Sequence, residues 1–168
     1  PGCGVNPIRG QNNVQGACDM GASPNQFPGY QNVTAPGILK KFETAWETKL
    51  SPNIGVMATD CFPKMLTREI RGLFIFGEDP VRTDPNTAHV IEALKTLDFL
   101  VVDDLFITET AKYADVILPG RSYTEKEGTF TNTERRVQRI RKAVEIEGET
   151  RDDTWIFTEI MNRMGYPQ

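Results

Sequence analysis

Three short, uninterrupted runs of apolar residues lie in the middle of this sequence, and they constrain its fold more than any other feature. The runs are Leu73–Phe76, Phe99–Val102 and, after a leading aspartate, 115–118. Such runs are typical of strands that are buried on both faces, as in a parallel sheet. An apolar stripe over 90–97 and a short helical pattern at 110–113 separate them. The alternation predicts strand–helix–strand units with right-handed crossovers.

The predicted fold class is therefore α/β, a three-layer αβα (Rossmann-like) parallel sheet. The helix between the first two strands is expected to begin with Asp84 as its N-cap and Pro85 in its first turn. Three further helices are expected where apolar residues recur at helical spacing, over 36–46, 60–70 and 154–164.

Two segments depart from this pattern. Residues 1–35 are rich in Gly and Pro and show almost no apolar periodicity, which predicts an irregular N-terminal loop segment. A long irregular segment in a compact domain is often functional. Residues 129–146 mix Val and Ile with Arg and Thr, and we expect a small hairpin excursion there. The expected division is a loop segment over 1–35 and an αβα domain over 36–168.

Composition excludes some classes of function. The net charge of -4 argues against a protein that tracks nucleic-acid phosphates. The three cysteines, Cys3, Cys18 and Cys61, form no C-x-x-C pair, so this chain alone does not indicate a zinc or iron–sulfur site. The sequence has no apolar run long enough to cross a membrane, and we expect no direct membrane insertion.

Acidic residues follow the predicted strands at the point where a ligand would bind. Open parallel sheets bind ligands outside the carboxyl ends of their strands. Residues 77–80, the pair Asp103 and Asp104, and Pro119 with Gly120 fall at such ends. A carboxylate can accept two hydrogen bonds side by side, which suits a guanine edge or a ribose diol. Because no G-x-G-x-x-G or Walker A loop accompanies them, the pattern indicates a nucleotide-type ligand without the usual phosphate fingerprint.

Several of these polar residues have a structural alternative. Asp84 is interpreted as a helix cap, and Asp153 either caps the last helix or binds a ligand. His89 is the single histidine of the chain, and we expect a surface or boundary residue without a catalytic partner. The basic cluster at 135–142 is interpreted as a solvated face, with a phosphate or partner contact as the alternative. Arg9 either caps loop carbonyls or clamps a small carboxylate with its fork.

Five stretches together resemble one family. They are Gly4–Gly21, Phe76–Pro80, Asp104–Ala111, Ala114–Pro119 and Glu127–Gln138. The fourth and fifth are similar to motifs shared across the molybdopterin-dependent oxidoreductases. The first closely resembles a loop of the formate dehydrogenase branch, and the resemblance covers nearly the whole chain. The sequence is thus identified as similar to an internal fragment of a formate dehydrogenase catalytic (alpha) subunit.

The resemblance implies a function for the longer parent enzyme. Formate would be oxidised to carbon dioxide at a molybdenum or tungsten centre held by molybdopterin guanine dinucleotides. Electrons would leave through a 4Fe-4S cluster toward electron-transfer subunits. The resemblance matches Arg9 to the arginine that orients formate, and places Gln11 in the same loop, facing the pterin. It matches the remaining cofactor contacts to seven further positions: Glu78, Asp79, Thr83, Asp103, Asp104, Lys126 and Asp153.

The match also omits parts of the family pattern. The metal-binding cysteine or selenocysteine, its neighbouring histidine and the cluster-binding cysteines lie upstream of the matched segment, so no metal ligand is expected here. We therefore expect the chain alone to lack formate dehydrogenase activity. Another molybdopterin oxidoreductase, such as a nitrate reductase or quinone oxidoreductase large subunit, and a non-catalytic nucleotide-binding module remain as alternatives. The compartment is expected to be cytoplasmic, with the periplasm as the alternative.

Overall fold

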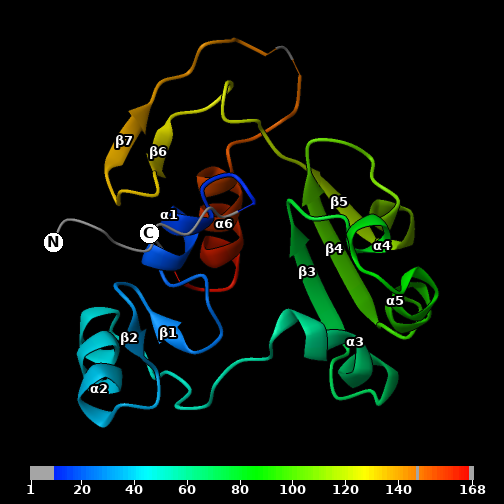
Figure 1. Ribbon diagram of the computed structural model, residues 1–168, viewed down its shortest axis with the longest axis horizontal. Coiled ribbons are helices and arrows are strands. Elements are labelled where there is room, and N and C mark those ends of the chain that lie inside the picture. The colour runs from blue at the N-terminus through cyan, green and yellow to red at the C-terminus, as the bar shows by residue number, and fades with distance from the viewer. Residues whose placement is uncertain (1–9, 147, 167–168) are drawn as a thin grey trace, which may run out of the picture. The chain divides into compact units, whose positions relative to one another are not determined.

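The computed structural model describes residues 10–146 and 148–166 (Figure 1). These residues divide into two compact units. The first unit takes the chain up to Met57 and, again, residues 128–140; the second takes residues 58–127 and the chain from 141 onward. The hairpin expected from the sequence thus belongs with the N-terminal segment, whereas the apolar strands belong to the second unit. The assignment of residues 36–168 as the cofactor-binding domain stays a prediction.

A parallel sheet forms the centre of the second unit. It consists of β3 (Gly72–Phe76), β4 (Phe99–Asp104) and β5 (Val116–Pro119), in the order β3-β4-β5 with both pairs parallel. The three apolar runs are these strands, so the prediction of a mixed α/β fold with a parallel sheet is confirmed. A wider Rossmann-like strand order stays a prediction.

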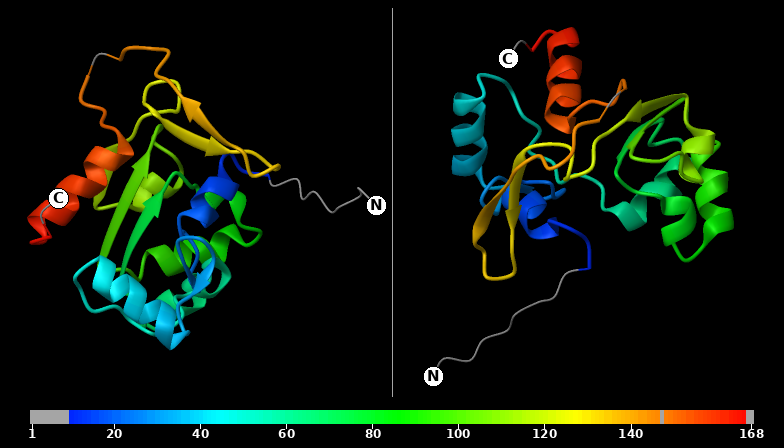
Figure 2. Two further views of the ribbon diagram at one scale, coloured as in Figure 1. Left: turned by 90° about the vertical axis from the view of Figure 1, so that its left-hand side faces the viewer. Right: turned by 90° about the horizontal axis from the view of Figure 1, so that it is seen from above.

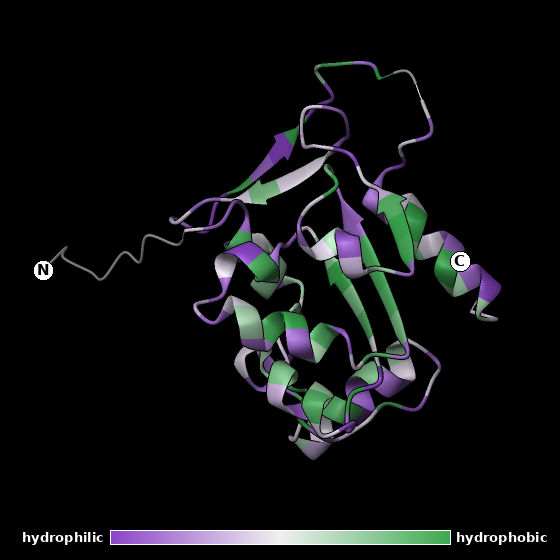
Figure 3. Ribbon diagram, turned by 90° about the vertical axis from the view of Figure 1, so that its right-hand side faces the viewer, coloured by the Kyte–Doolittle hydropathy of each residue, from purple (hydrophilic) through white to green (hydrophobic). Residues whose placement is uncertain are grey.

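Helices lie on both faces of this sheet (Figures 1 and 2). One face carries α3 (Ala58–Leu66), α4 (Pro80–Thr83), α5 (Thr87–Leu94) and the 3-10 helix η1 (Thr110–Tyr113), and the other carries α6 (Asp153–Arg163). Leu100 and Val102 of β4 point into the first face, where they are buried with Met65 of α3 and Val90 of α5. Figure 3 shows the predominantly apolar strands beside amphipathic helices. Alternation along β4 then directs Asp103 to the α6 face.

The contact with α6 runs through aromatic rings. Phe157 of α6 lies with its ring centroid 5.5 Å from that of Phe74 and 5.4 Å from that of Phe76. This contact holds the N-terminal half of α6 near the carboxyl ends of the strands. The residues around Asp153 are thereby placed beside the strand ends.

The first unit is built from short elements. It contains α1 (Val14–Asp19), the antiparallel pair β1 (Gln26–Phe27) and β2 (Gln31–Asn32), α2 (Pro36–Ala45), and the hairpin β6 (Gly128–Thr131) and β7 (Val137–Ile140). The predicted hairpin is confirmed. The prediction of irregular structure over 1–35 is wrong for α1, β1 and β2. Gln15 of α1 donates to Asp19 and to the Tyr30 hydroxyl, and Phe27 of β1 packs on an aromatic ring of α2. The buried ring of Phe42 stacks on the ring of Phe27, with 4.6 Å between the ring centroids. Its centroid lies 4.9 Å from that of Trp46.

Two helix boundaries differ clearly from the sequence prediction. The helix expected to begin at Asp84 begins at Thr87, because Asn86 is its N-cap and accepts a hydrogen bond from the His89 amide at 3.2 Å. A proline disfavours helical backbone in the residue before it, and Asp84 is extended. The helix expected over 60–70 ends at Leu66.

No described helix is long and apolar enough to cross a membrane.

Candidate functional site

The side chain of Asp103 is the most unusual feature of the sheet's carboxyl edge. Asp103 is the fifth residue of β4 and is only 1% exposed. Neither of its carboxylate oxygens has a hydrogen-bond partner among the described residues. Buried polar groups are nearly always hydrogen-bonded, and an unpaired one costs about 1–3 kcal/mol. A buried carboxylate without a partner therefore marks Asp103 as a candidate ligand contact.

The electrostatic surroundings of Asp103 match this reading. Burial raises the pKa of its carboxyl group, the positive charge of Lys126 opposes the rise, and the charge of Asp104 adds to it. The group thus takes up a proton more readily than an exposed aspartate. A ligand that donates two hydrogen bonds to the carboxylate would reverse this shift.

Lys126 and Asp153 form an ion pair beside this carboxylate. Their side chains are 24% and 20% exposed. Burial lowers the pKa of Lys126, whereas the nearby carboxylates of Asp152 and Asp103 act to raise it. Asp153 is not the N-cap of α6, because Asp152 fills that role and accepts from the Thr154 amide at 2.8 Å. The capping alternative for Asp153 is therefore wrong, and its carboxylate is directed to Lys126.

Gly120 leaves space in front of these two carboxylates. An ideal Cβ at Gly120 would lie 2.7 Å from Oδ1 of Asp103 and 3.6 Å from Oδ1 of Asp153. The Gly120 amide donates to the carbonyl of Asp104 at 3.2 Å, and the Arg151 amide donates to the carbonyl of Pro119 at 3.1 Å. The backbone at the end of β5 is thus held close to the acidic pair. The structure brings Asp103, Lys126 and Asp153 together. The strand-end argument predicted Asp103 at this edge, and the family resemblance added Lys126 and Asp153.

Asp79 has a structural role. Its Oδ1 accepts from the Thr110 hydroxyl at 2.6 Å and from the Thr110 amide at 3.0 Å, and its Oδ2 accepts from the Glu109 amide at 3.4 Å. The buried Thr110 hydroxyl also accepts from the Val81 amide at 3.1 Å. Asp79 therefore fastens the loop after β3 to η1. Its cofactor contact stays a prediction, and Thr110 is a residue that the sequence reasoning missed.

The other three positions predicted at this edge are more exposed than Asp103. Oδ1 of half-buried Asp104 accepts from the amides of Leu105 and Phe106, at 2.6 and 3.4 Å, which shapes the turn after β4. The exposed Thr83 donates its hydroxyl to the Asp79 carbonyl at 3.2 Å. Glu78 is exposed in the loop after β3. Their roles as cofactor contacts stay predictions.

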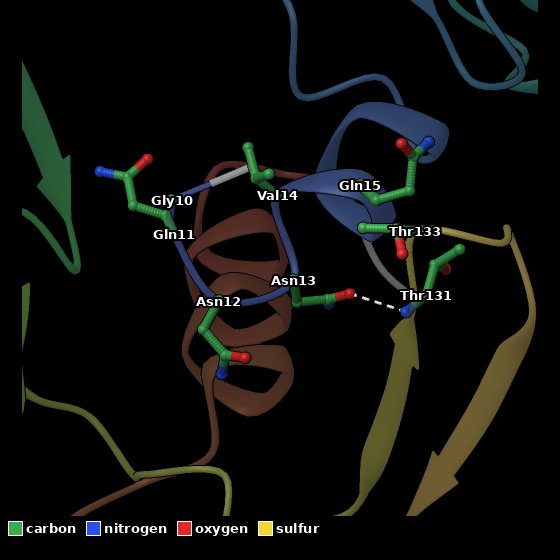
Figure 4. A pocket seen from close by; sticks show the side chains of 8 residues that line it. All are labelled: Gly10, Gln11, Asn12, Asn13, Val14, Gln15, Thr131 and Thr133. Atoms are coloured by element: carbon green, nitrogen blue, oxygen red, sulfur yellow. Dashed lines mark hydrogen bonds between the residues drawn. The ribbon is translucent and has the colours of Figure 1, made fainter. Parts of the chain in front are cut away.

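A polar pocket lies in the first unit, beside α1 and β6 (Figure 4). Its volume is about 370 Å³, and its lining consists of Gly10, Gln11, Asn12, Asn13, Val14, Gln15, Thr131 and Thr133. Carboxamides and hydroxyls dominate this lining, and none of its side chains carries a formal charge. Gln11 thus lines a pocket, and its contact with a pterin stays a prediction. Arg9, predicted as the substrate-orienting arginine, lies outside the described residues.

The remaining polar residues singled out from the sequence have structural surroundings. His89 is half-buried on α5, which confirms its boundary position. Arg135 of the basic cluster forms an ion pair with Oδ1 of Asp19 at 3.0 Å. Its guanidinium carbon lies 5.1 Å from the ring centroid of Tyr30. Burial acts to raise the pKa of Asp19, but hydrogen bonds from Gln15, Arg135 and Tyr30 outweigh it and lower that pKa. Within residues 10–146 and 148–166, no three His, Cys, Asp or Glu side chains gather into a potential metal site.

The carboxyl edge of the sheet can therefore bind a ligand that donates hydrogen bonds in pairs. Asp103 supplies two unpartnered acceptors, and Lys126, paired with Asp153, supplies a cation beside them. A guanine edge or a ribose diol satisfies the acceptors, and a phosphate satisfies the lysine.

Comparisons with known proteins identify the relatives of this chain. The chain is 55% identical over 168 residues to the F420-dependent formate dehydrogenase subunit alpha of Methanocaldococcus jannaschii, a match that covers 98% of the chain and 24% of that protein. It is 46% identical over 168 residues to formate dehydrogenase H of Escherichia coli, covering 99% of the chain and 24% of that protein. The chain thus spans about a quarter of the length of these relatives.

The fold has a solved counterpart. The acetylene hydratase of Pelobacter acetylenicus superposes with a TM-score of 0.60 at 26% sequence identity, over 79% of this chain and 19% of that one. Residues 1–163 match the sequence model of the molybdopterin oxidoreductases. The acidic strand ends, the polar loop pocket and this match along nearly the whole chain lead to one conclusion: the chain belongs to the molybdopterin oxidoreductase family.

Proposed function

We propose that this chain is part of a formate dehydrogenase and binds a guanine nucleotide portion of its molybdopterin cofactor. The observation that carries the binding proposal is the buried carboxylate of Asp103, whose two oxygens lack partners among the described residues. Formate as substrate is supported by relatives at 46% and 55% identity that are formate dehydrogenases. The Arg9 loop, which resembles the formate branch, supports the same substrate.

The residues present fit the guanine dinucleotide form of the cofactor. Asp103 would accept the paired N–H groups of guanine, or alternatively a ribose diol, at the end of β4. Lys126 would exchange Asp153 for a phosphate oxygen, because an ammonium group binds phosphate as a point charge. Gln11 would face the pterin from the loop pocket. Asp79, Asp104, Glu78, Thr83 and Asp153 complete the proposed set of contacts, with Asp79 also fastening η1.

Arg9 is proposed to hold formate. A guanidinium fork binds both oxygens of a carboxylate, which fixes the direction of the C–H bond. Oxidation of formate then gives carbon dioxide, one proton and two electrons. The bound molybdenum or tungsten centre supplies the two-electron acceptor. The proposal retains the 4Fe-4S cluster, the electron-transfer subunits and the cytoplasmic compartment expected from the resemblance, and these belong to the longer polypeptide and its complex.

A nucleotide panel tests the binding proposal on the chain itself. Calorimetric titration with GMP, IMP and 2′,3′-dideoxy-GMP separates the two ligand groups, because IMP lacks the guanine amino group and the dideoxy compound lacks the diol. We expect GMP to bind and IMP to bind at least about tenfold more weakly, since it leaves one buried acceptor unpaired. Equal binding of GMP and IMP, with loss of binding for the dideoxy compound, would assign Asp103 to ribose. No binding by any of the three would contradict the proposal.

The substrate is tested in the full-length polypeptide that carries this segment. We expect formate to reduce an artificial electron acceptor with the full-length enzyme, and Arg9→Lys to raise the KM for formate because it keeps the charge but removes the fork. The 168-residue chain alone is expected to give no turnover. An unchanged KM in Arg9→Lys would contradict the assigned role of Arg9.

A further inference from the structure

Asn13 connects the loop before α1 to strand β6. Its side-chain amide nitrogen donates to the Thr129 carbonyl at 3.2 Å, and its side-chain oxygen accepts from the Thr131 amide at 2.9 Å. Figure 4 shows the second of these bonds across one side of the pocket. A residue of a parallel neighbouring strand would bridge a carbonyl and an amide two residues apart in the same way. One side chain therefore takes the place of a strand beside β6.

The backbone and side chain of Asn13 adopt a conformation that makes this contact instead of capping the helix. Asn13 occupies the N-cap position of α1, where an asparagine ordinarily caps its own helix, but its side chain makes no capping bond. Its backbone is left-handed, with φ +56, a region that asparagine tolerates better than most residues. The Asn13 side chain thus bonds residues of β6 instead of making the local capping bond that its position favours. Such departures tend to mark functional positions.

Gly16 provides the space that the Asn13 side chain occupies. An ideal Cβ at Gly16 would overlap the side-chain oxygen of Asn13 and lie 2.9 Å from its amide carbon. Gly16 lies within α1, where alanine would favour the helix more than glycine does. The glycine therefore costs helix stability and leaves the space that the Asn13 side chain occupies. By contrast, a Cβ at Gly37 in α2 would meet nothing within 4 Å.

The Asn13 bridge joins two walls of the pocket. One wall is the loop 10–13 with Gln11, and the other includes Thr131 and Thr133. Because the bridge spans both, the spacing between the loop and the end of β6 depends on it. The loop follows Arg9 directly in the sequence.

We propose that Asn13 is a positioning residue, which presets the loop after Arg9 against β6, and that Gly16 is required to seat it. The bridge itself rests only on the hydrogen bonds and the glycine geometry. Its consequence for formate rests on the proposed function. Gly16 does not line the pocket, so Gly16→Ala displaces the Asn13 side chain without replacing any pocket-lining residue.

Hydrogen exchange of the Thr131 amide measures the bridge in the chain itself. We expect Asn13→Ala and Gly16→Ala to speed exchange at Thr131 by about 3- to 10-fold, the equivalent of one lost hydrogen bond. Asn13→Asp keeps the acceptor for the Thr131 amide but loses the donor to the Thr129 carbonyl, so exchange at Thr131 should speed up less than in Asn13→Ala. Gly37→Ala is the matched control and should leave Thr131 unchanged. Unchanged exchange in both Asn13→Ala and Gly16→Ala would overturn the bridge.

The positioning role is measured in the full-length enzyme. We expect Gly16→Ala to raise the KM for formate several-fold with little change in kcat, and Gly37→Ala to change neither. Faster Thr131 exchange with an unchanged KM would overturn the positioning role and leave a purely structural bridge. If the wild-type enzyme does not oxidise formate at all, the proposed function fails, while the exchange experiment still decides the bridge.

Discussion

Replacing Asp103 with asparagine should have opposite effects on stability and on ligand binding. The side chain is 1% exposed and its oxygens have no hydrogen-bond partner among the described residues. Asp103→Asn keeps the shape of the side chain and removes its ability to ionise. It therefore separates the electrostatic cost of this group from its packing.

The expected change in the free energy of unfolding follows from the burial of the Asp103 side chain. An unsatisfied buried polar group costs about 1–3 kcal/mol, and an ionised one costs more. Asparagine leaves an amide unsatisfied and loses the attraction between Asp103 and Lys126, so part of the gain is offset. We expect Asp103→Asn to raise the free energy of unfolding by about 1 kcal/mol at pH 7. For a unit of this size that corresponds to roughly 4–8 °C in Tm.

The same substitution should weaken ligand binding. A hydrogen bond to a charged acceptor contributes about 1.5–3 kcal/mol, which is about 10- to 100-fold in Kd. We expect Asp103→Asn to weaken GMP binding by this factor, because its amide group would also place a donor against the donors of guanine. Thermal unfolding followed by circular dichroism and calorimetric titration with GMP are measured on the same preparation. A variant that is less stable than wild type and binds GMP equally well would refute the reasoning.

Three other expectations concern pH, a fastening contact and a cap. Because the pKa of Asp103 is raised in the folded chain, the folded state binds more protons than the unfolded state above the ordinary value of 3.8. Stability should therefore fall as the pH rises from about 4 toward the folded pKa, and thermal melts of Asp103→Asn should show a shallower fall. Asp79→Ala leaves the buried Thr110 hydroxyl without its acceptor and should cost about 1–3 kcal/mol in denaturant unfolding. Asn86→Ala removes the cap of α5 and should cost about 1 kcal/mol, whereas Asp84→Ala, the cap expected from the sequence, should cost less.

The sheet could be predicted from the sequence because burial on both faces leaves a direct signature. Continuous apolar runs permit few alternatives, and the helices between them follow from spacing. The ends of the helices could be predicted less well from the sequence. Asp84 and Asn86 are both good capping residues, and Asp152 and Asp153 are chemically identical. Which of each pair caps its helix depends on backbone angles that a sequence pattern does not specify.

The candidate site was predictable in part for a similar reason. Strand ends placed Asp103 and Asp104 at one edge, but the alternation of β4 decides that only Asp103 is buried. The engagement of Asp79 with Thr110 joins residues 31 positions apart, and the bridge from Asn13 to Thr131 joins residues 118 positions apart. Contacts at such separations arise from the folded chain and leave no local spacing in the sequence.

The guanine nucleotide content of the full-length polypeptide tests the central claim most directly. Acid releases GMP from a guanine dinucleotide cofactor, and chromatography quantifies it per polypeptide. We expect wild-type protein and the exposed α5 variant Glu92→Gln to release equal amounts of GMP, and Asp103→Asn to release much less while remaining folded. Full GMP content in a folded Asp103→Asn protein, or no GMP in the wild type, would contradict the assignment of the sheet's carboxyl edge as the nucleotide site.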